Sequence, residues 1–176
     1  MMSIINWFLK WWLRSGRYQW SRLRRRLCER RYLSTSLPAV SSLDDIKINL
    51  SCVTWTMDGP LHLFDSISYP QTVWAKKKDD CDGFSILAAT LIRHWNHGIN
   101  PVLITAITRP VKKSHTVCAF TSPGGGLWFF DNAILRQEEY KTYKDIVLRI
   151  SENTQRLVCW DVRNPESLDM LEFHKD

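Results

Sequence analysis

The clearest periodic pattern in the chain lies between residues 82 and 97. Apolar side chains recur there at intervals of three and four residues: Phe84, Leu87, Ala88, Leu91 and Trp95. This spacing places them on one face of an α-helix, so we expect a helix over 82–97 with that stripe in the core. Gly98 follows the pattern, at the position where a helix-ending glycine is most common.

A β-hairpin is predicted further along the chain. Residues 115–120 and 127–131 are rich in β-branched and aromatic side chains, and the segment 121–126 between them contains one proline and three glycines. Such a segment between two short strands is typical of a hairpin turn. If the turn is centred on Pro123, antiparallel pairing places residue 115 directly opposite residue 131.

The remaining patterns indicate a single α+β domain over residues 46–163. We expect strands over 46–57, 101–108 and 156–162, an approach to the first helix over 66–73, and a second helix over 137–150. The tail 164–176 is polar and is expected to be peripheral.

The N-terminal segment, residues 1–33, has a different character. Residues 1–13 are almost wholly apolar with four aromatic side chains, and arginines dominate residues 14–31. Apolar positions at helical spacing, with basic positions largely off that stripe, predict a basic amphipathic helix. Its apolar run is too short to span a bilayer, and its charges follow the apolar region, unlike those of a signal peptide. The serine-rich segment 34–45 predicts a linker.

Charge is unevenly distributed along the 176 residues. Residues 1–33 carry nine Lys or Arg and one Glu, a balance of +8, whereas the remainder carries 15 Lys or Arg and 17 Asp or Glu, a balance of −2. The folded domain is therefore near neutral. The chain has five cysteines, an odd number, and none forms a closely spaced pair. This usage predicts reduced thiols in a cytoplasmic compartment rather than a disulfide framework.

Cys81 is the candidate nucleophile, because it directly precedes the predicted helix and a helix N-terminus favours the thiolate form. In the predicted hairpin, His115 and Asp131 have Cβ atoms about 4.5–5.5 Å apart, so Asp131 would orient the imidazole. A thiol, an imidazole and a carboxylate together match a Cys-His-Asp nucleophilic site. A register slip of one residue would separate His115 and Asp131 onto opposite faces.

The residues around Cys81 also fit a purely structural role. Asp80 is a suitable helix cap, Asp82 favours the positive end of the helix, and Cys81 would then be a small core residue. Both aspartates oppose thiolate formation, so a protonated His115 would have to outweigh them.

The sequence resembles the transglutaminase-like superfamily over about residues 68–135. Residues 80–91 (Asp-Cys-Asp-Gly-Phe-Ser-Ile-Leu-Ala-Ala-Thr-Leu) with Gly-Ile-Asn-Pro-Val at 98–102 are similar to its nucleophile segment. Residues 115–120, 126–131 and 70–74 are similar to its histidine strand, its aspartate strand and the segment before the nucleophile. The family usually has Gly two residues before the cysteine, where this chain has Asp79. The resemblance implies a papain-like fold, with the nucleophile helix packed on an antiparallel sheet.

The same resemblance implies a cysteine peptidase, amidase or acyltransferase that acts on peptide or isopeptide amides. Cys81 would attack the carbonyl carbon, His115 would accept the thiol proton and later protonate the leaving amine, and Asp131 would orient His115. The backbone N–H of Cys81 and a side-chain donor would hold the oxyanion, with Gln71 and Trp74 as candidates for that donor. This chemistry needs no metal and no cofactor.

The N-terminal helix suggests a second kind of function. The candidate contact residues are Trp7, Trp11, Trp12, Trp20, Arg24 and Arg25. A Trp-rich basic helix suits an anionic membrane surface or a groove on a partner protein, and nucleic acid less well. The alternatives are that the helix packs on its own domain, or that the chain is a structural or adaptor component of a larger assembly, such as a virus or phage particle.

Overall fold

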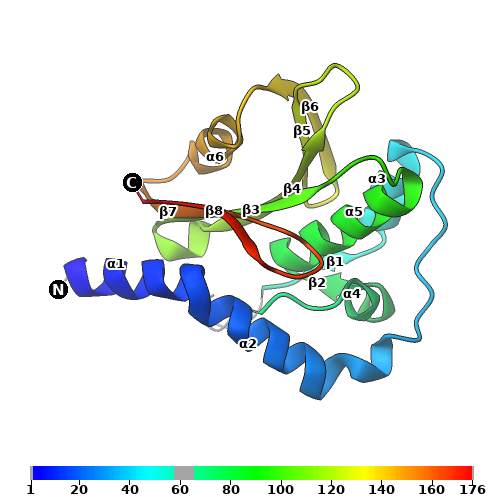
Figure 1. The fold of residues 1–176 in the computed structure, drawn as a ribbon, viewed down its shortest axis with the longest axis horizontal. Coiled ribbons are helices and arrows are strands. Elements are labelled where there is room, and N and C mark those ends of the chain that lie inside the picture. Colours follow the sequence, from blue (N-terminus) through cyan, green and yellow to red (C-terminus); the bar gives the residue numbers. More distant parts are fainter. Residues whose placement is uncertain (1, 58–65, 176) are drawn as a thin grey trace.

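The computed structural model describes residues 2–57 and 66–175 of the chain. Its centre is a six-stranded antiparallel sheet in the order β6-β5-β4-β3-β7-β8 (Figure 1). The strands are β3 (Val102–Arg109), β4 (His115–Thr121), β5 (Leu127–Asp131), β6 (Ile134–Tyr140), β7 (Arg156–Arg163) and β8 (Met170–Lys175). A separate parallel pair, β1 (Thr54–Trp55) and β2 (Lys78–Asp79), lies just before the candidate nucleophile.

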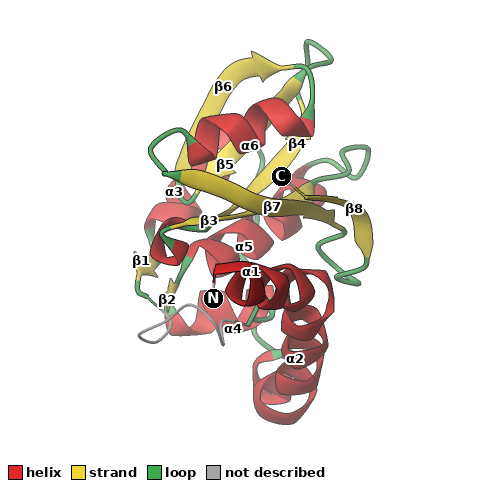
Figure 2. Ribbon diagram, turned by 90° about the vertical axis from the view of Figure 1, so that its left-hand side faces the viewer, coloured by secondary structure: helices red, strands yellow, loops and turns green. Residues whose placement is uncertain are grey.

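Helices cover both faces of the sheet. They are α1 (Met2–Trp11), α2 (Arg17–Arg24), α3 (Leu43–Ser51), α4 (Pro70–Lys76), α5 (Cys81–Trp95) and α6 (Tyr143–Ser151). Figure 2 shows α6 on one side of the sheet and α5 with α1 on the other. Strand alternation builds the two cores: Leu103, Cys118 and Phe130 pack with α5, whereas Val117 and Phe129 pack with α6. The prediction of an α+β fold with a helix on an antiparallel sheet is confirmed.

The central helix α5 is buried on almost every side. Four of the five predicted stripe residues are buried, and so are Ile86, Ala89 and Ile92 between them. The helix ends earlier than predicted, because Asn96 adopts an extended conformation and its Oδ1 accepts a hydrogen bond from the Gly98 N–H at 2.9 Å. Gly98 is therefore not the left-handed cap that we predicted, and Gly125 is the one described glycine with a positive φ.

The strand predicted over 46–57 is wrong for most of its length, because α3 occupies this part of the chain. Ser42 caps the helix by accepting a hydrogen bond from the Asp45 N–H at 3.1 Å. Ile46 and Leu50 are buried, but Ile48 is 62 % exposed. The apparent alternation of apolar residues is thus one side of a helix plus a single exposed isoleucine.

One prediction for the C-terminal part of the chain is wrong over part of its length, whereas the strand over 156–162 is confirmed as β7. The helix predicted over 137–150 is the strand β6 followed by α6, which begins behind a capping box of Thr142 and Asp145. The tail 164–176 contains β8, an edge strand paired with β7. Its side chains are mostly exposed, so the sequence carries no buried alternation to reveal it.

Residues 2–32 form one almost continuous helical segment, which we call the N-terminal helix. A π-helical turn at Trp12–Gly16 joins α1 to α2, and a second π-helical turn at Arg25–Glu29 and a 3₁₀ turn at Arg30–Tyr32 follow. Within the described residues, no helix combines the length and the apolar character needed to cross a bilayer. Residues 36–40 of the predicted linker form no helix or strand, and the linker ends where α3 begins.

The inner face of the N-terminal helix packs on the domain. Leu9, Leu13 and Tyr18 are buried in the same core as α5. The Arg163 guanidinium donates hydrogen bonds to the carbonyls of Leu13 and Arg14, at 3.1 and 2.9 Å. This inward packing corresponds to the self-packing alternative from the sequence.

Candidate active site

Cys81 is the first residue of α5 and is 8 % exposed. The preceding residue, Asp80, caps the helix by accepting a hydrogen bond from the Asp82 N–H at 3.0 Å. The Cys81 sulfur therefore lies where the unpaired N–H groups of a helix converge, and these groups favour negative charge.

The segment before Cys81 has Asp79 at the position where the family resemblance predicts a glycine. Asp79 lies in the extended strand β2, and the left-handed conformation is found two residues earlier, at Lys77, with φ 54°. The Asp79 side chain packs over Gly83 so closely that a Cβ on Gly83 would lie 2.3 Å from the Cβ of Asp79. Glycine is thus needed at position 83, one helical turn into α5, and not at position 79.

The side chains of His115 and Asp131 meet at the end of the sheet where β4 begins and β5 ends. Nε2 of His115 lies 2.8 Å from Oδ1 of Asp131. The predicted register of the hairpin is wrong by two residues, since Cys118 pairs with Phe130. Continued to the end of the hairpin, this register places Asp131 opposite residue 117 and diagonal to His115. A slip of two keeps both side chains on one face, and a diagonal pair of long side chains remains within reach.

Cys81 lies close to His115, because both residues line the same two cavities. Burial alone would lower the pKa of the imidazole, but the interactions with Asp131 and Cys81 raise it to about 10. The hydrogen bond from His115 lowers the pKa of the Asp131 carboxyl in turn. The imidazole therefore favours its protonated form, hydrogen-bonded to a carboxylate and close to the Cys81 sulfur.

A hydroxyl bridge fixes the start of α5 against the start of β4. Ser85 Oγ lies 2.7 Å from the Cys81 carbonyl oxygen and 3.0 Å from the Thr116 carbonyl oxygen. Thr116 is the neighbour of His115 on β4, and its Oγ1 lies 3.1 Å from Oγ1 of Thr105 on β3. The helix α5, which carries the thiol, is thus hydrogen-bonded to the strand β4, which carries the imidazole, at the residue next to His115.

The N-terminal helix supplies a charge that sequence reasoning did not anticipate. Arg17 forms an ion pair with Asp82, and both side chains are almost fully buried. Nη1 of Arg17 also lies 3.4 Å from Oγ1 of Thr105. One of the two aspartates that oppose a thiolate at Cys81 is therefore compensated by a guanidinium.

Cys81 and His115 line two cavities that share the site. The larger has a volume of about 330 Å³, is open to solvent, and is also lined by Trp55, Met57 and Asn132. The smaller, of about 30 Å³, is lined in addition by Leu9, Trp12 and Arg17 of the N-terminal helix. The hairpin, β1 and the N-terminal helix together surround the sulfur. No sequence signal identified Trp55 or Arg17, because both are distant in sequence from the motif around Cys81.

The two candidate oxyanion donors, Gln71 and Trp74, lie on α4 and line neither of these cavities. Oε1 of Gln71 is buried and forms no hydrogen bond with any described residue. The Trp74 ring packs against the main core, and the Lys77 ammonium lies over its outer face.

The other cysteines differ from Cys81, and all five are unpaired. Cys118 and Cys159 are buried, and burial raises the pKa of both thiols, that of Cys159 to about 12. Cys28 and Cys52 are exposed.

One group of potential metal ligands exists among the described residues. Asp80, Cys81 and Asp82 offer ligand atoms within 4.8 Å of one another. Asp80 is engaged as the helix cap and Asp82 in the ion pair with Arg17, so the cluster is explained without an ion.

The predicted contact residues of the N-terminal helix separate into two groups. Trp7, Trp11 and Trp20 are between 45 and 67 % exposed. Trp12 faces the small cavity. Arg25 is buried and donates to the carbonyls of residues 67 and 68, and Arg24 hydrogen-bonds Ser66 and pairs with Glu29. The two arginines therefore anchor the helix to the domain and do not face outward.

Comparisons with known proteins add a structural similarity to this geometry, but no match in sequence. No protein-family model matches the sequence, and a search of the curated proteins gives no match. Among solved structures, the fold is similar to that of LapG from Legionella pneumophila in an EGTA-treated form. The similarity covers 76 % of this chain and 70 % of the other, with 12 % sequence identity and a TM-score of 0.46. A likeness at this level assigns neither family nor function, which leaves the site itself as the basis for a proposal.

Proposed function

We propose that the chain is a thiol enzyme of the transglutaminase-like type that cleaves or transfers peptide or isopeptide bonds through Cys81, His115 and Asp131. The observation that carries the proposal is the imidazole of His115, which is hydrogen-bonded to the carboxylate of Asp131 and lines the same two cavities as the thiol of Cys81. A structural domain has no need for this order of groups at a solvent-open cavity.

The proposed reaction follows from the positions of these groups. The Cys81 thiolate attacks the amide carbonyl carbon, and the backbone N–H groups at the start of α5 stabilise the oxyanion. The His115 imidazolium gives its proton to the amine as the C–N bond breaks, which leaves a thioester on Cys81. Water or an amine, deprotonated by His115, then attacks the thioester and regenerates the thiolate. Asp131 keeps the imidazole in orientation throughout.

The larger cavity fits an extended polypeptide as the substrate. Its lining combines the half-exposed Trp55 and Met57 with Lys112 and Lys113. Apolar walls suit side chains flanking the scissile bond, and the two lysines favour an acidic residue nearby.

The test is the pH dependence of alkylation by iodoacetamide, with each cysteine followed by mass spectrometry. The five thiols provide internal controls, since Cys28 and Cys52 are exposed without a histidine partner in the described structure, and Cys118 and Cys159 are buried. We expect Cys81 to react fastest at neutral pH, despite its burial, and to lose that advantage in His115→Ala.

The proposal is contradicted if Cys81 in the wild-type chain reacts no faster than Cys28 at neutral pH, because the thiol is then not activated. The structural or adaptor function would then be the better description of this domain.

A further inference from the structure

The outer face of the N-terminal helix carries a stripe of apolar side chains that the domain does not cover. We call this set the outer stripe: Ile4, Ile5, Trp7, Trp11, Trp20, Leu23 and Leu27. Their exposed fractions run from 41 % at Ile5 to 74 % at Leu27. Scattered exposed apolar residues are normal, but a row along one helix marks an interaction surface.

Apart from Ile5, the outer stripe consists of two runs with the same spacing. Residues 4, 7 and 11 form the first run, and residues 20, 23 and 27 form the second. In a regular α-helix, 16 residues would leave the runs about 160° apart around the axis. The π-helical turn at Trp12–Gly16 underwinds the helix between them. The burial pattern agrees, because Leu13, Arg17 and Tyr18 between the runs are all buried against the domain.

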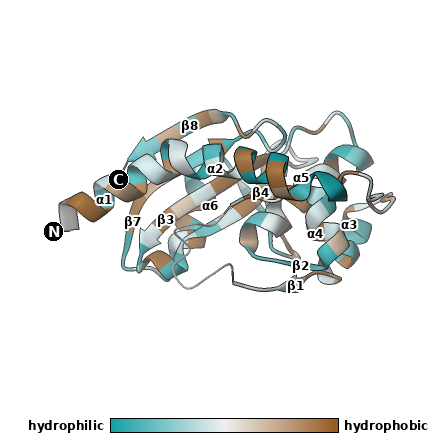
Figure 3. Cartoon of the chain, turned by 90° about the horizontal axis from the view of Figure 1, so that it is seen from below, coloured by the Kyte–Doolittle hydropathy of each residue, from teal (hydrophilic) through white to brown (hydrophobic). Residues whose placement is uncertain are grey.

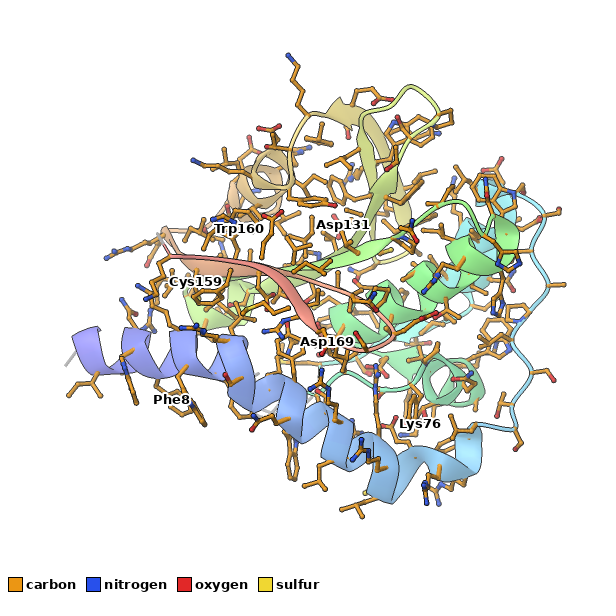
Figure 4. All side chains as sticks on the ribbon, in the orientation of Figure 1. Phe8, Lys76, Asp131, Cys159, Trp160 and Asp169 are labelled. Carbon is orange, nitrogen blue, oxygen red and sulfur yellow. The ribbon has the colours of Figure 1, made fainter. Side chains whose placement is uncertain are left out.

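Figure 3 looks toward this side of the molecule and shows hydrophobic positions interspersed with hydrophilic ones along the helix. Phe8 lies on the side of α1 that faces away from the sheet (Figure 4). Its ring centroid is 5.9 Å from that of Trp11, so Phe8 contacts an aromatic side chain of the first run.

The charges beside the outer stripe are all of one sign. Lys10, Arg14, Arg26, Arg30 and Arg31 form no ion pair with any described residue, and each is at least partly exposed. The single acidic residue of the segment, Glu29, is 2 % exposed and points into the domain. Arg22 is engaged by Asp169 at 2.6 Å and is not counted in this set.

We propose that the outer stripe and its basic flank bind an anionic phospholipid surface, with the helix lying in the plane of the interface. Tryptophan side chains favour the boundary between headgroups and acyl chains, and lysine and arginine favour anionic headgroups. Insertion of apolar side chains or attraction to anionic headgroups alone gives weak attachment, but the two together give stable attachment.

Two other occupants fit the surface less well. A second copy of the chain would bring two rows of like charge together, which opposes association. Nucleic acid would satisfy the arginines but would leave Ile4, Leu23 and Leu27 without apolar partners. A lipid surface matches both the charges and the aliphatic side chains.

Lipid binding would place the candidate active site near the membrane. Leu9 and Trp12, on the opposite side of the same helix, line the small cavity beside Cys81. The thiol would thus lie roughly one helix diameter, about 10 Å, from the lipid surface. This consequence does not depend on catalysis, so the two proposals fail separately.

Flotation of the full chain with vesicles tests the proposal. We expect the wild type to float with phosphatidylcholine–phosphatidylserine vesicles, much less with phosphatidylcholine alone, and less at high salt. Trp7→Ala/Trp11→Ala should weaken partitioning by at least about tenfold. The matched control is Ile48→Ala/Leu148→Ala, which removes equally exposed apolar residues from α3 and α6 and should leave flotation unchanged.

A charge variant separates the electrostatic contribution to lipid binding from the apolar contribution. Arg26→Gln/Arg30→Gln/Arg31→Gln should abolish the preference for the anionic vesicles, whereas Lys141→Gln/Lys144→Gln on the far side should not. The proposal is overturned if the wild type floats with no vesicle, or if the double-tryptophan variant floats as well as its control. Binding to a DNA duplex without flotation, or a dimer in ultracentrifugation that the tryptophan variant loses, would likewise assign the surface to another partner.

Discussion

Two parts of the molecule approach Cys81 from different sides, and they contribute different things. The β4–β5 hairpin brings His115, which shares two cavities with the thiol and can move a proton. The N-terminal helix brings Arg17, which ion-pairs with Asp82 and cannot change its protonation at ordinary pH. The first contribution is chemical and the second is electrostatic and structural.

Because the two contributions differ, removing them should have different effects, one on reactivity and the other on folding. Loss of the hairpin groups should remove reactivity from a protein that still folds, because His115 is at the end of its strand and partly exposed. Loss of Arg17 should damage folding first, because it leaves the Asp82 carboxylate buried without a partner. Each prediction below tests one side of this division.

His115→Ala should have the largest effect. Removal of the general base and acid should lower amide turnover, or Cys81 alkylation at neutral pH, by about 10²–10⁴-fold. Near pH 10, where the stabilisation from the protonated imidazole is lost, its unfolding midpoint in urea should stay close to that of the wild type. His94→Ala, an exposed histidine in the last turn of α5, is the matched control and should change neither quantity.

Arg17→Met should mainly affect stability. An uncompensated buried carboxylate costs about 3–5 kcal/mol in the free energy of unfolding. Asp82→Asn in the same chain should recover most of that loss, since the charge is then absent. If Arg17→Met unfolds at the wild-type urea concentration, or if Asp82→Asn fails to restore it, the ion pair does not have the role assigned to it.

Asp131→Asn should be intermediate. The imidazolium loses a charge-assisted hydrogen bond of roughly 1.5–3 kcal/mol, which corresponds to about 10–100-fold in turnover. The pKa of His115 should fall as well, which NMR of the imidazole would report directly. Glu138→Gln on the neighbouring strand is a suitable control, and an unchanged His115 titration would argue against the observed hydrogen bond.

The pH dependence of stability should carry the signature of His115. Its pKa is about 10 in the folded chain and about 6.5 in a free side chain. The folded state therefore retains a proton that the unfolded state loses between these values. The stabilisation is fully present below pH 6.5 and disappears as the pH rises to about 10. The difference in urea midpoint between the wild type and His115→Gln should shrink over the same range.

The smallest effects are expected at Gln71 and Trp74. Removal of an oxyanion donor lowers kcat by about 10²–10³-fold, but neither side chain lines a cavity at Cys81, so we expect Gln71→Ala and Trp74→Phe to stay within about twofold. A hundredfold loss in either variant would show that the side chain reaches the reacting carbonyl when substrate binds.

The sequence predicted the hairpin better than it predicted the details of pairing. The turn residues located β4 and β5, but the register was off by two residues, and the meeting of His115 and Asp131 survives only because strand side chains alternate with a period of two. The same period misled us over residues 46–57. There the cap formed by Ser42 and Asp45 was the better signal, and it indicates a helix.

Contacts between distant segments could not be predicted in the same way. Arginines in the N-terminal segment are compatible with a solvated face, and nothing local distinguishes Arg17 or Arg25 from Arg26. Burial decides between them: Arg17 meets Asp82, Arg25 meets two backbone carbonyls, and Arg26 remains exposed. Only the folded chain determines which charges become anchors.

The π-helical turn at Trp12–Gly16 makes the N-terminal helix unusually sensitive to its own length. The turn already holds one residue more than regular winding would, so insertion of a further residue there would rotate α1 by about 100° relative to α2. Leu9 and Leu13 would then leave the core together, and the Trp12 ring would no longer pack against position 16. Among natural variants of this chain, substitutions along the segment should therefore be far more common than single-residue insertions.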